Sequence, residues 1–244
     1  MARQKTNAKK IAEGRCTGIG ASYVPFYLAS EAKSMGTASM IPDMIEGRMI
    51  HTLSTVETDF YWLLRWSDDT LHIREQYLLN HAYVNDVRMT LGLKRVSSNT
   101  CCYTTDFLVD LIDGSQRAYS VKFKAADFDP NNIKYAGSPK RYAALIERQN
   151  IERLYWESQG IPFSIITSEL INRVYSKNIA YVMGFYNPLL ICNSEQKLMY
   201  LIAHKIVHVD MEHEKLNPKR LLEQLNIDVD TLYEKVTSEV IGIE

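Results

Sequence analysis

The stretch from Tyr103 to Phe123, YTTDFLVDLIDGSQRAYSVKF, decides the fold of this chain. Two runs rich in β-branched and aromatic residues, 103–112 and 117–123, lie on either side of the turn sequence DGSQ. Such runs around a short turn that contains glycine predict an antiparallel hairpin. Asp106 interrupts the first run and Lys122 stands in the second. Charged residues inside a sheet need a reason, because ionisable groups are rarely buried without a partner.

The length of the hairpin loop decides whether Asp106 and Lys122 can act together. Neighbouring residues of a strand point to opposite faces of a sheet, whereas directly opposed residues of two antiparallel strands share a face. A two-residue loop, 113–114, pairs Asp106 with Val121 and puts Lys122 on the wrong face. A three-residue loop, 113–115, pairs Asp106 with Lys122. A joint role for these charges therefore predicts an odd-length loop or a β-bulge.

Helices and strands are predicted on both sides of the hairpin. Ser54 is an N-cap residue before apolar side chains at helical spacing, and Gly160 ends the helix that Ser138 and Pro139 begin. The predicted elements are a helix over 54–66, a strand over 71–79, a polar loop to Asn99, a helix over 138–159 and a buried strand over 163–167. This order predicts an α/β fold in which helices flank a mixed sheet.

The pattern changes after Thr167 to short helical segments. Residues 194–208 keep apolar side chains on one face, Asn217-Pro218 begins a second helix, Asp230 caps a third, and a short strand is expected over 240–243. We therefore expect two domains. Residues 1–167 form the larger domain with a basic N-terminal arm, and residues 168–244 form a small, mainly helical, winged-helix-like domain.

The composition is that of an ordinary packed protein. Of the 244 residues, 46% are hydrophobic and 23% are charged, which excludes disordered and collagen-like classes. The four cysteines contain no CxxC, so they predict neither a disulfide framework nor a thiolate zinc site, and a cytoplasmic location is expected. No run reaches the roughly 20 apolar residues that a membrane span requires.

Charge is balanced overall but uneven along the chain. The net charge is −1, from 28 basic and 29 acidic residues. The candidate DNA contacts are the basic residues of the N-terminal arm and of the loop after residue 79: Lys9, Lys10, Arg15, Arg88, Lys94 and Arg95. A solvated surface is the alternative for both groups. Residues 195–244 hold six bases and ten acids, so this part is expected to bind a protein and not DNA.

Asp106 and Lys122 also suggest a chemistry. A strand carboxylate, a second carboxylate from a neighbouring helix and a backbone carbonyl form an all-oxygen site that suits Mg²⁺ or Mn²⁺. Metal ions held in this way can neutralise a phosphodiester and position the attacking water. A cross-strand ion pair is the structural alternative for these two residues. His204 and His208 have the spacing of metal ligands but lack a third partner, so they are interpreted as surface residues.

Several spaced motifs together resemble the TnsA endonuclease family of heteromeric transposases, over roughly residues 15–180. They are GIGASYVP at 18–25, SMG at 34–36, residues 48–57, IREQ at 73–76, TTDFLV at 104–109, SVK at 120–122 and IERLYW at 151–156. The resemblance implies a restriction-endonuclease-like fold of the PD-(D/E)xK type. It also implies Mg²⁺-dependent cleavage, with Mn²⁺ as an alternative, of the 5′ strands at double-stranded transposon ends. Implied partners are a TnsB-like transposase and a TnsC-like AAA+ ATPase, the latter bound by the C-terminal domain.

Carried over by position, the resemblance places the catalytic set on Glu57, Asp106 and Lys122, with Glu57 and Asp106 as metal ligands. Where Ser120 stands, the metal is expected to rely on the carbonyl of Val121 or on water. Glu75 is an auxiliary carboxylate. The family commonly has Gln or Glu two residues before the lysine, where this chain has Ser120, whose hydroxyl reaches less far. Two alternatives follow, a stand-alone restriction or repair nuclease on the same fold, and a scaffold that bridges transposase and ATPase without catalysis.

Overall fold

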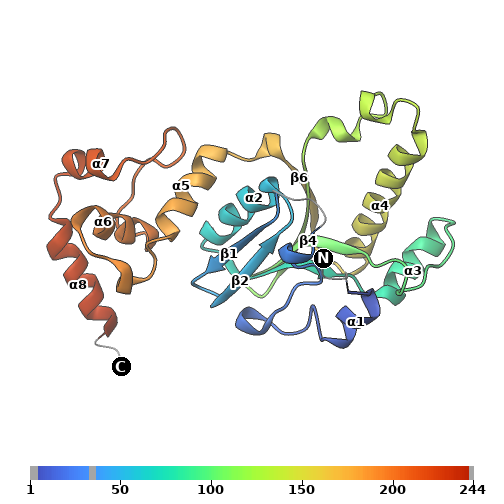
Figure 1. The fold of residues 1–244 in the computed structure, drawn as a ribbon, viewed down its shortest axis with the longest axis horizontal. Coiled ribbons are helices and arrows are strands. Elements are labelled where there is room, and N and C mark those ends of the chain that lie inside the picture. The colour runs from blue at the N-terminus through green and yellow to red at the C-terminus, as the bar shows by residue number, and fades with distance from the viewer. Residues whose placement is uncertain (1–4, 33–36, 242–244) are drawn as a thin grey trace. The chain divides into compact units, whose positions relative to one another are not determined.

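The computed structural model describes residues 5–32 and 37–241, and it divides into two compact units, Met1–Ile171 and Asn172–Glu244 (Figure 1). The division falls between Ile171 and Asn172, close to the expected boundary after residue 167. The motif at 34–36 lies outside the described residues.

The described residues of the first unit form two sheets. A two-stranded antiparallel sheet pairs β1 (Ser39–Asp43) with β2 (Arg48–Thr52). A four-stranded sheet has the order β3 (Thr70–Leu78), β4 (Thr104–Leu111), β5 (Gln116–Lys122) and β6 (Phe163–Thr167). Its first three strands are antiparallel, and β6 joins β5 in parallel. The mixed sheet predicted from the sequence is therefore confirmed.

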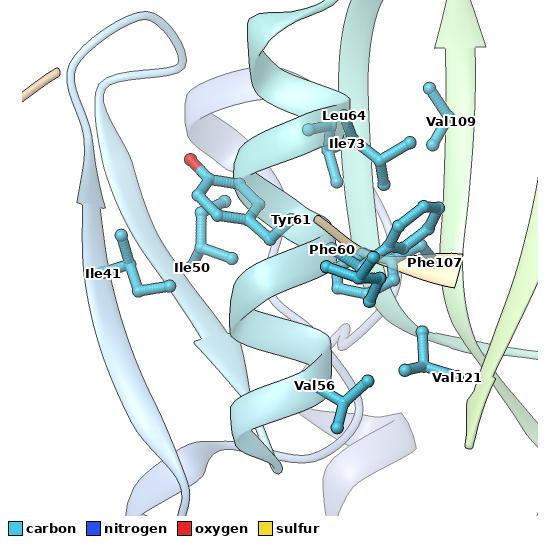
Figure 2. Close-up of a cluster of buried hydrophobic side chains, with 11 residues drawn as sticks. Ile41, Ile50, Val56, Phe60, Tyr61, Leu64, Ile73, Phe107, Val109 and Val121 are labelled. Carbon is cyan, nitrogen blue, oxygen red and sulfur yellow. The ribbon is translucent and has the colours of Figure 1, made fainter. Parts of the chain in front are cut away.

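Helix α2 (Thr55–Trp66) covers one face of the larger sheet, and Ser54 caps it by accepting the N–H of Glu57. Figure 2 shows Val56, Phe60 and Leu64 turned toward the strands, where they meet Phe107, Val109 and Val121. Tyr61 is turned the other way, toward Ile41 and Ile50 of the small sheet. One helix thus buries apolar side chains against both sheets, and this burial is the main force that holds the layers together.

The opposite face of the larger sheet packs against α3 (His81–Thr90) and α4 (Pro139–Ser158). Val84 and Val87 of α3 and Ile151, Tyr155 and Trp156 of α4 are buried there together with strand side chains. The segment 81–90, expected as part of a polar loop, is a helix because Asn80 caps it and because tertiary contacts bury its polar residues.

A buried ionic cluster fixes the small sheet to the rest of the unit. Glu46, in the turn between β1 and β2, accepts hydrogen bonds from Arg65 of α2 (2.8 Å), Arg48 of β2 (3.0 Å) and the backbone N–H of Ile73 (2.7 Å). Arg65 also forms an ion pair with Asp43 at 2.9 Å. The turn of the hairpin is thereby tied to α2 and β3.

The remaining short elements all belong to the first unit except the last of them. They are α1 (Asn7–Ala12) and the 3₁₀ turns Gly20–Ser22, Ala29–Glu31, Ala125–Phe128, Ile133–Tyr135, Ser168–Leu170 and Pro188–Leu190.

The second unit is built from α5 (Arg173–Met183), α6 (Ser194–Ala203), α7 (Pro218–Leu225) and α8 (Val229–Ile241). Buried Asn178 of α5 connects them to the loop after α6, because its amide donates to the carbonyls of Met211 and Glu214, both at 2.8 Å, and its oxygen accepts the N–H of Leu216. No strand occurs in the described part of this unit. The β-hairpin wing of the expected winged-helix-like domain is therefore absent from residues 172–241.

Three local predictions in the second unit were wrong. The helix expected over 194–208 ends at Ala203, and residues 240 and 241 are helical, while 242 and 243 lie outside the described residues. Asp228, and not Asp230, accepts the N–H of Thr231 at the start of α8, because Asp230 forms an ion pair with Lys197 at 2.8 Å. None of the helices in the described ranges is long and apolar enough to cross a membrane.

Candidate active site

Asp106 and Lys122 come together where β4 and β5 separate. The pairing of these strands runs from Asp110 opposite Gln116 to Phe107 opposite Tyr119. Continued by one step, it sets Asp106 opposite Ser120, so Lys122 follows on the same face as both. The ammonium of Lys122 lies 3.4 Å from Asp106 Oδ2.

The hairpin loop has the odd length that this arrangement requires. The backbone N–H of Leu111 donates to the carbonyl of Ser115 at 2.9 Å, which leaves the three residues 112–114 as the loop. The loop therefore lies one residue earlier than the predicted 113–115, and Asp106 faces Ser120 where Lys122 was expected directly opposite.

The Asp106 carboxylate is held on one oxygen. Its Oδ2 accepts the backbone N–H of Val121 at 2.6 Å and lies within 3.4 Å of the Ser120 hydroxyl, beside the Lys122 ammonium. All three of these contacts are made to Oδ2, and none is made to the other oxygen, Oδ1. About one fifth of the Asp106 side chain is exposed. One carboxylate oxygen is thus oriented by the protein while the other is left to face solvent or an ion.

The Lys122 ammonium marks a place that suits a cation. It donates to the Ser120 hydroxyl at 2.6 Å and to the Val121 carbonyl at 3.1 Å, in addition to its contact with Asp106. Two of these oxygens, from Asp106 and Val121, are the predicted metal ligands. A positive charge already bridges them, so the donor set fits a hard divalent cation. Ser120 is part of this arrangement through its hydroxyl.

Glu57 lies in the first turn of α2 and is 7% exposed. Its Oε2 accepts the N–H of Leu53 at 2.8 Å and the side-chain amide of Gln76 at 3.1 Å, and its Oε1 accepts the Ser54 hydroxyl at 2.9 Å. Burial, and next the negative charge of Asp106, raise the pKa of Glu57 to about 7 against these hydrogen bonds. A buried carboxylate that is costly to ionise beside a second carboxylate is suited to hold a cation.

Glu152 of α4 is a second buried carboxylate near Asp106, and sequence reasoning missed it. It is 2% exposed, and its Oε1 accepts the hydroxyl of Thr105 at 2.8 Å. Thr105 in turn accepts the indole N–H of Trp156 at 2.7 Å. Burial, followed by Asp106, raises the pKa of Glu152 to about 7. The sequence holds one indication: Glu152 lies in the IERLYW motif, one helical turn before the apolar Tyr155 and Trp156.

Within residues 5–32 and 37–241, no three His, Cys, Asp or Glu side chains gather closely enough to hold a metal ion by themselves. The predicted ligand set contains two such side chains, Glu57 and Asp106, and a backbone carbonyl. The predicted ligand set therefore differs from a site made of three ionisable side chains. It suits Mg²⁺, which usually keeps several water ligands and binds few protein ligands.

The structure contradicts the auxiliary role expected for Glu75. This residue is fully buried, and both of its carboxylate oxygens accept hydrogen bonds from the guanidinium of Arg48, at 2.9 and 2.8 Å. The backbone N–H of His51 donates to it as well, at 3.0 Å. Glu75 therefore joins β3 to β2, and its charge is already neutralised.

Three of the expected DNA contacts are wrong because their charges are buried against carboxylates. Lys10 is 1% exposed and lies 3.4 Å from Glu31, while Arg15 binds both oxygens of Glu31 at 2.8 and 2.7 Å. Arg88 is also buried and donates to Glu147 at 2.9 Å.

The other three expected DNA contacts, Lys9, Lys94 and Arg95, are exposed. Arg95 forms an exposed ion pair with Asp86 at 3.2 Å. Exposure leaves all three accessible to DNA.

The histidine pair of the second unit does not lie on one helix. Helix α6 ends before His204, whose ring stacks on Tyr186 with centroids 4.2 Å apart and lies 3.0 Å from the Tyr186 carbonyl. His204 and His208 therefore do not share the helical face on which their spacing would matter.

Comparison with known proteins gives two findings. Residues 67–168 match the family model of the TnsA-like endonuclease N-terminal domain. The Transposon Tn7 transposition protein TnsA of Escherichia coli is 28% identical over 237 residues, which cover 96% of this chain and 80% of that protein. The matched segment includes Asp106, Ser120 and Lys122, and the longer alignment extends over both units.

Proposed function

Because the chain belongs to the TnsA-like endonuclease family, whose fold is restriction-endonuclease-like, we propose that it is the subunit of a heteromeric transposase that hydrolyses the 5′ strands at transposon ends. The observation that carries the proposal is that Asp106, Lys122 and the Val121 carbonyl come together where β4 and β5 separate. The negative charge of Asp106 also helps to raise the pKa of Glu57 in α2. These groups are the ones that metal-assisted phosphodiester hydrolysis requires.

We propose Mg²⁺ as the cofactor, with Mn²⁺ as an alternative, held by Asp106, the Val121 carbonyl and Glu57. When bound, the metal supplies positive charge at the scissile phosphate and a more acidic water. Asp106 is oriented for this task by the Val121 N–H. Lys122 sits beside both oxygens and is positioned to donate a hydrogen bond to the attacking water or to a phosphoryl oxygen. Ser120 orients the ammonium through its hydroxyl.

The DNA contacts need residues with exposed charge. The segment after β5 carries Lys124, Lys140 and Arg141, all exposed, and Lys124 lies only two residues beyond Lys122. We propose that phosphates next to the cleaved bond lie along this segment, with Lys9, Lys94 and Arg95 as further contacts. Replacing Lys140 and Arg141 by Ala should lower the salt dependence of DNA binding by about one counterion for each phosphate that is no longer neutralised.

Partners and location complete the proposal. A TnsB-like transposase would bring the transposon ends, and a TnsC-like AAA+ ATPase would bind the second unit. The excess of ten acids over six bases in residues 195–244 supports a protein partner there and opposes DNA. The assembly would act on double-stranded DNA in the cytoplasm.

The test is cleavage of end-labelled donor DNA by the full chain with its cognate transposase and Mg²⁺, with the two strands resolved. We expect the 5′ strand to be cut and Asp106→Ala to abolish the cut while the folded structure remains, measured by circular dichroism. Persisting Mg²⁺-dependent nicking by Asp106→Ala would reject the site. Specific cutting without any partner would favour a stand-alone nuclease, and DNA ends left intact in the complete assembly would favour a non-catalytic scaffold.

A further inference from the structure

Gln76 has an unusual backbone for a residue inside a strand. Its φ is +48°, in the left-handed region that favours glycine, and its side chain is 2% exposed. The pairing of β3 with β4 passes over it, from Glu75 opposite Phe107 to Tyr77 opposite Thr105. The residue that this register leaves opposite Gln76 is Asp106. A buried residue of this kind is held in an unfavourable backbone only where its surroundings enforce it, and such residues gather at functional sites.

The N-terminal segment supplies the surroundings. The carbonyl of Gln76 accepts the backbone N–H of Phe26 at 3.2 Å and lies 3.5 Å from the thiol of Cys16. On either side, the Tyr23 hydroxyl donates to the carbonyl of Glu75 at 2.8 Å, and the N–H of Leu78 donates to Cys16 at 3.3 Å. Residues 16–26 therefore hold β3 in its local conformation at Gln76.

The result of this conformation is a hydrogen bond to the candidate metal ligand. The side-chain amide of Gln76 donates to Glu57 Oε2 at 3.1 Å. The other donors to this carboxylate, Leu53 and Ser54, belong to the start of the same helix as Glu57. Among the described residues, Gln76 is thus the side chain that connects the Glu57 carboxylate to the sheet that carries Asp106.

We propose that Gln76 is a positioning residue that fixes the Glu57 carboxylate relative to Asp106, so that both can bind one divalent cation; this inference rests on the proposed function. Partners of metal ligands orient those ligands, and their loss typically lowers metal affinity about 10- to 100-fold. The left-handed backbone is needed because it turns the amide of a residue in β3 toward α2.

The experiment measures Mn²⁺ affinity of the full chain by isothermal titration calorimetry, together with the melting temperature in EDTA. Gln76→Met keeps the length of the side chain and removes the donor, and we expect Mn²⁺ binding to weaken about 10- to 100-fold. Gln76→Gly also removes the donor but adopts the left-handed backbone without strain. We expect it to lose the same affinity and to melt no lower than Gln76→Met.

Gln116→Met is the matched control. The Gln116 amide also donates to a carboxylate, that of Asp110, but at the other end of the same sheet. We expect its Mn²⁺ affinity to stay within about twofold of the wild type. Wild-type affinity in Gln76→Met would overturn the inference, and so would recovery of both stability and affinity in Gln76→Gly. A wild-type chain that binds no Mn²⁺ would instead overturn the proposed metal site, and with it this role.

Discussion

At the scale of single residues, the site combines carboxylates that the fold makes costly to ionise. Glu57 approaches Asp106 from α2 and Glu152 from α4, the helices on opposite faces of the sheet. Burial and the shared neighbour raise the pKa of each to about 7. Without a cation, the accumulated negative charge destabilises the folded protein, and a bound cation should relieve this cost.

Glu152→Gln should therefore change stability in a way that depends on pH. The pKa of Glu152 in the folded protein is raised from 4.5 to about 7. As pH rises through that interval, the folded protein becomes less stable, because the carboxyl ionises more readily in the unfolded state than in the folded state. Glutamine keeps an oxygen for the Thr105 hydroxyl and cannot ionise. We expect little benefit at pH 5 and a gain of at most about 3 kcal/mol at pH 8.

The measurement is urea unfolding at both pH values in EDTA. The control is Glu157→Gln, on an exposed position of the same helix. Its difference in stability from the wild type should be the same at the two pH values. A stability difference between Glu152→Gln and the wild type that does not grow with pH would contradict the explanation.

At the scale of elements, local sequence was sufficient where the element carries its own start and stop. Ser54 predicts the start of α2, and Pro139 and Gly160 bound α4. The small β1–β2 sheet escaped prediction because Met40 and Met49 are exposed while Ile41 and Ile50 are buried, so both faces are apolar and no alternation is visible.

The residues of the candidate site divide in the same way, into those that local sequence indicates and those that depend on distant contacts. Asp106 and Lys122 were visible as charges in a strand, and Glu57 came from the family resemblance. Glu152 was missed because its burial depends on Thr105, which is 47 positions away in the chain. Arg15 was misjudged because a count of charges does not reveal that Glu31 lies against it.

The β1–β2 hairpin should depend strongly on Glu46. Glu46→Ala leaves the guanidinium groups of Arg48 and Arg65 and the N–H of Ile73 without this buried acceptor. Removing one member of a buried ionic cluster typically costs about 3–5 kcal/mol. Urea unfolding should show a loss of that size, and the Ile73 amide should exchange faster with deuterium.

Glu157→Ala serves as the comparison, because its ion pair with Arg153 is exposed on both sides. It should cost about 1 kcal/mol or less. Equal losses in the two variants would show that the cluster around Glu46 does not stabilise the hairpin as argued.

At the scale of the whole molecule, the two units have separate cores, and stability should therefore be lost separately. Asn178, 2% exposed, satisfies three backbone groups of the second unit. Asn178→Ala leaves those groups buried without a partner, at a cost of about 1–3 kcal/mol for each unsatisfied group that water does not reach. We expect hydrogen exchange in the full chain to accelerate throughout α6 and to stay unchanged in β4 and β5, while Lys177→Ala at the neighbouring exposed position alters neither. Equal acceleration in both units would mean that they unfold as one, and a protein bound to the second unit would then also influence the stability of the candidate site.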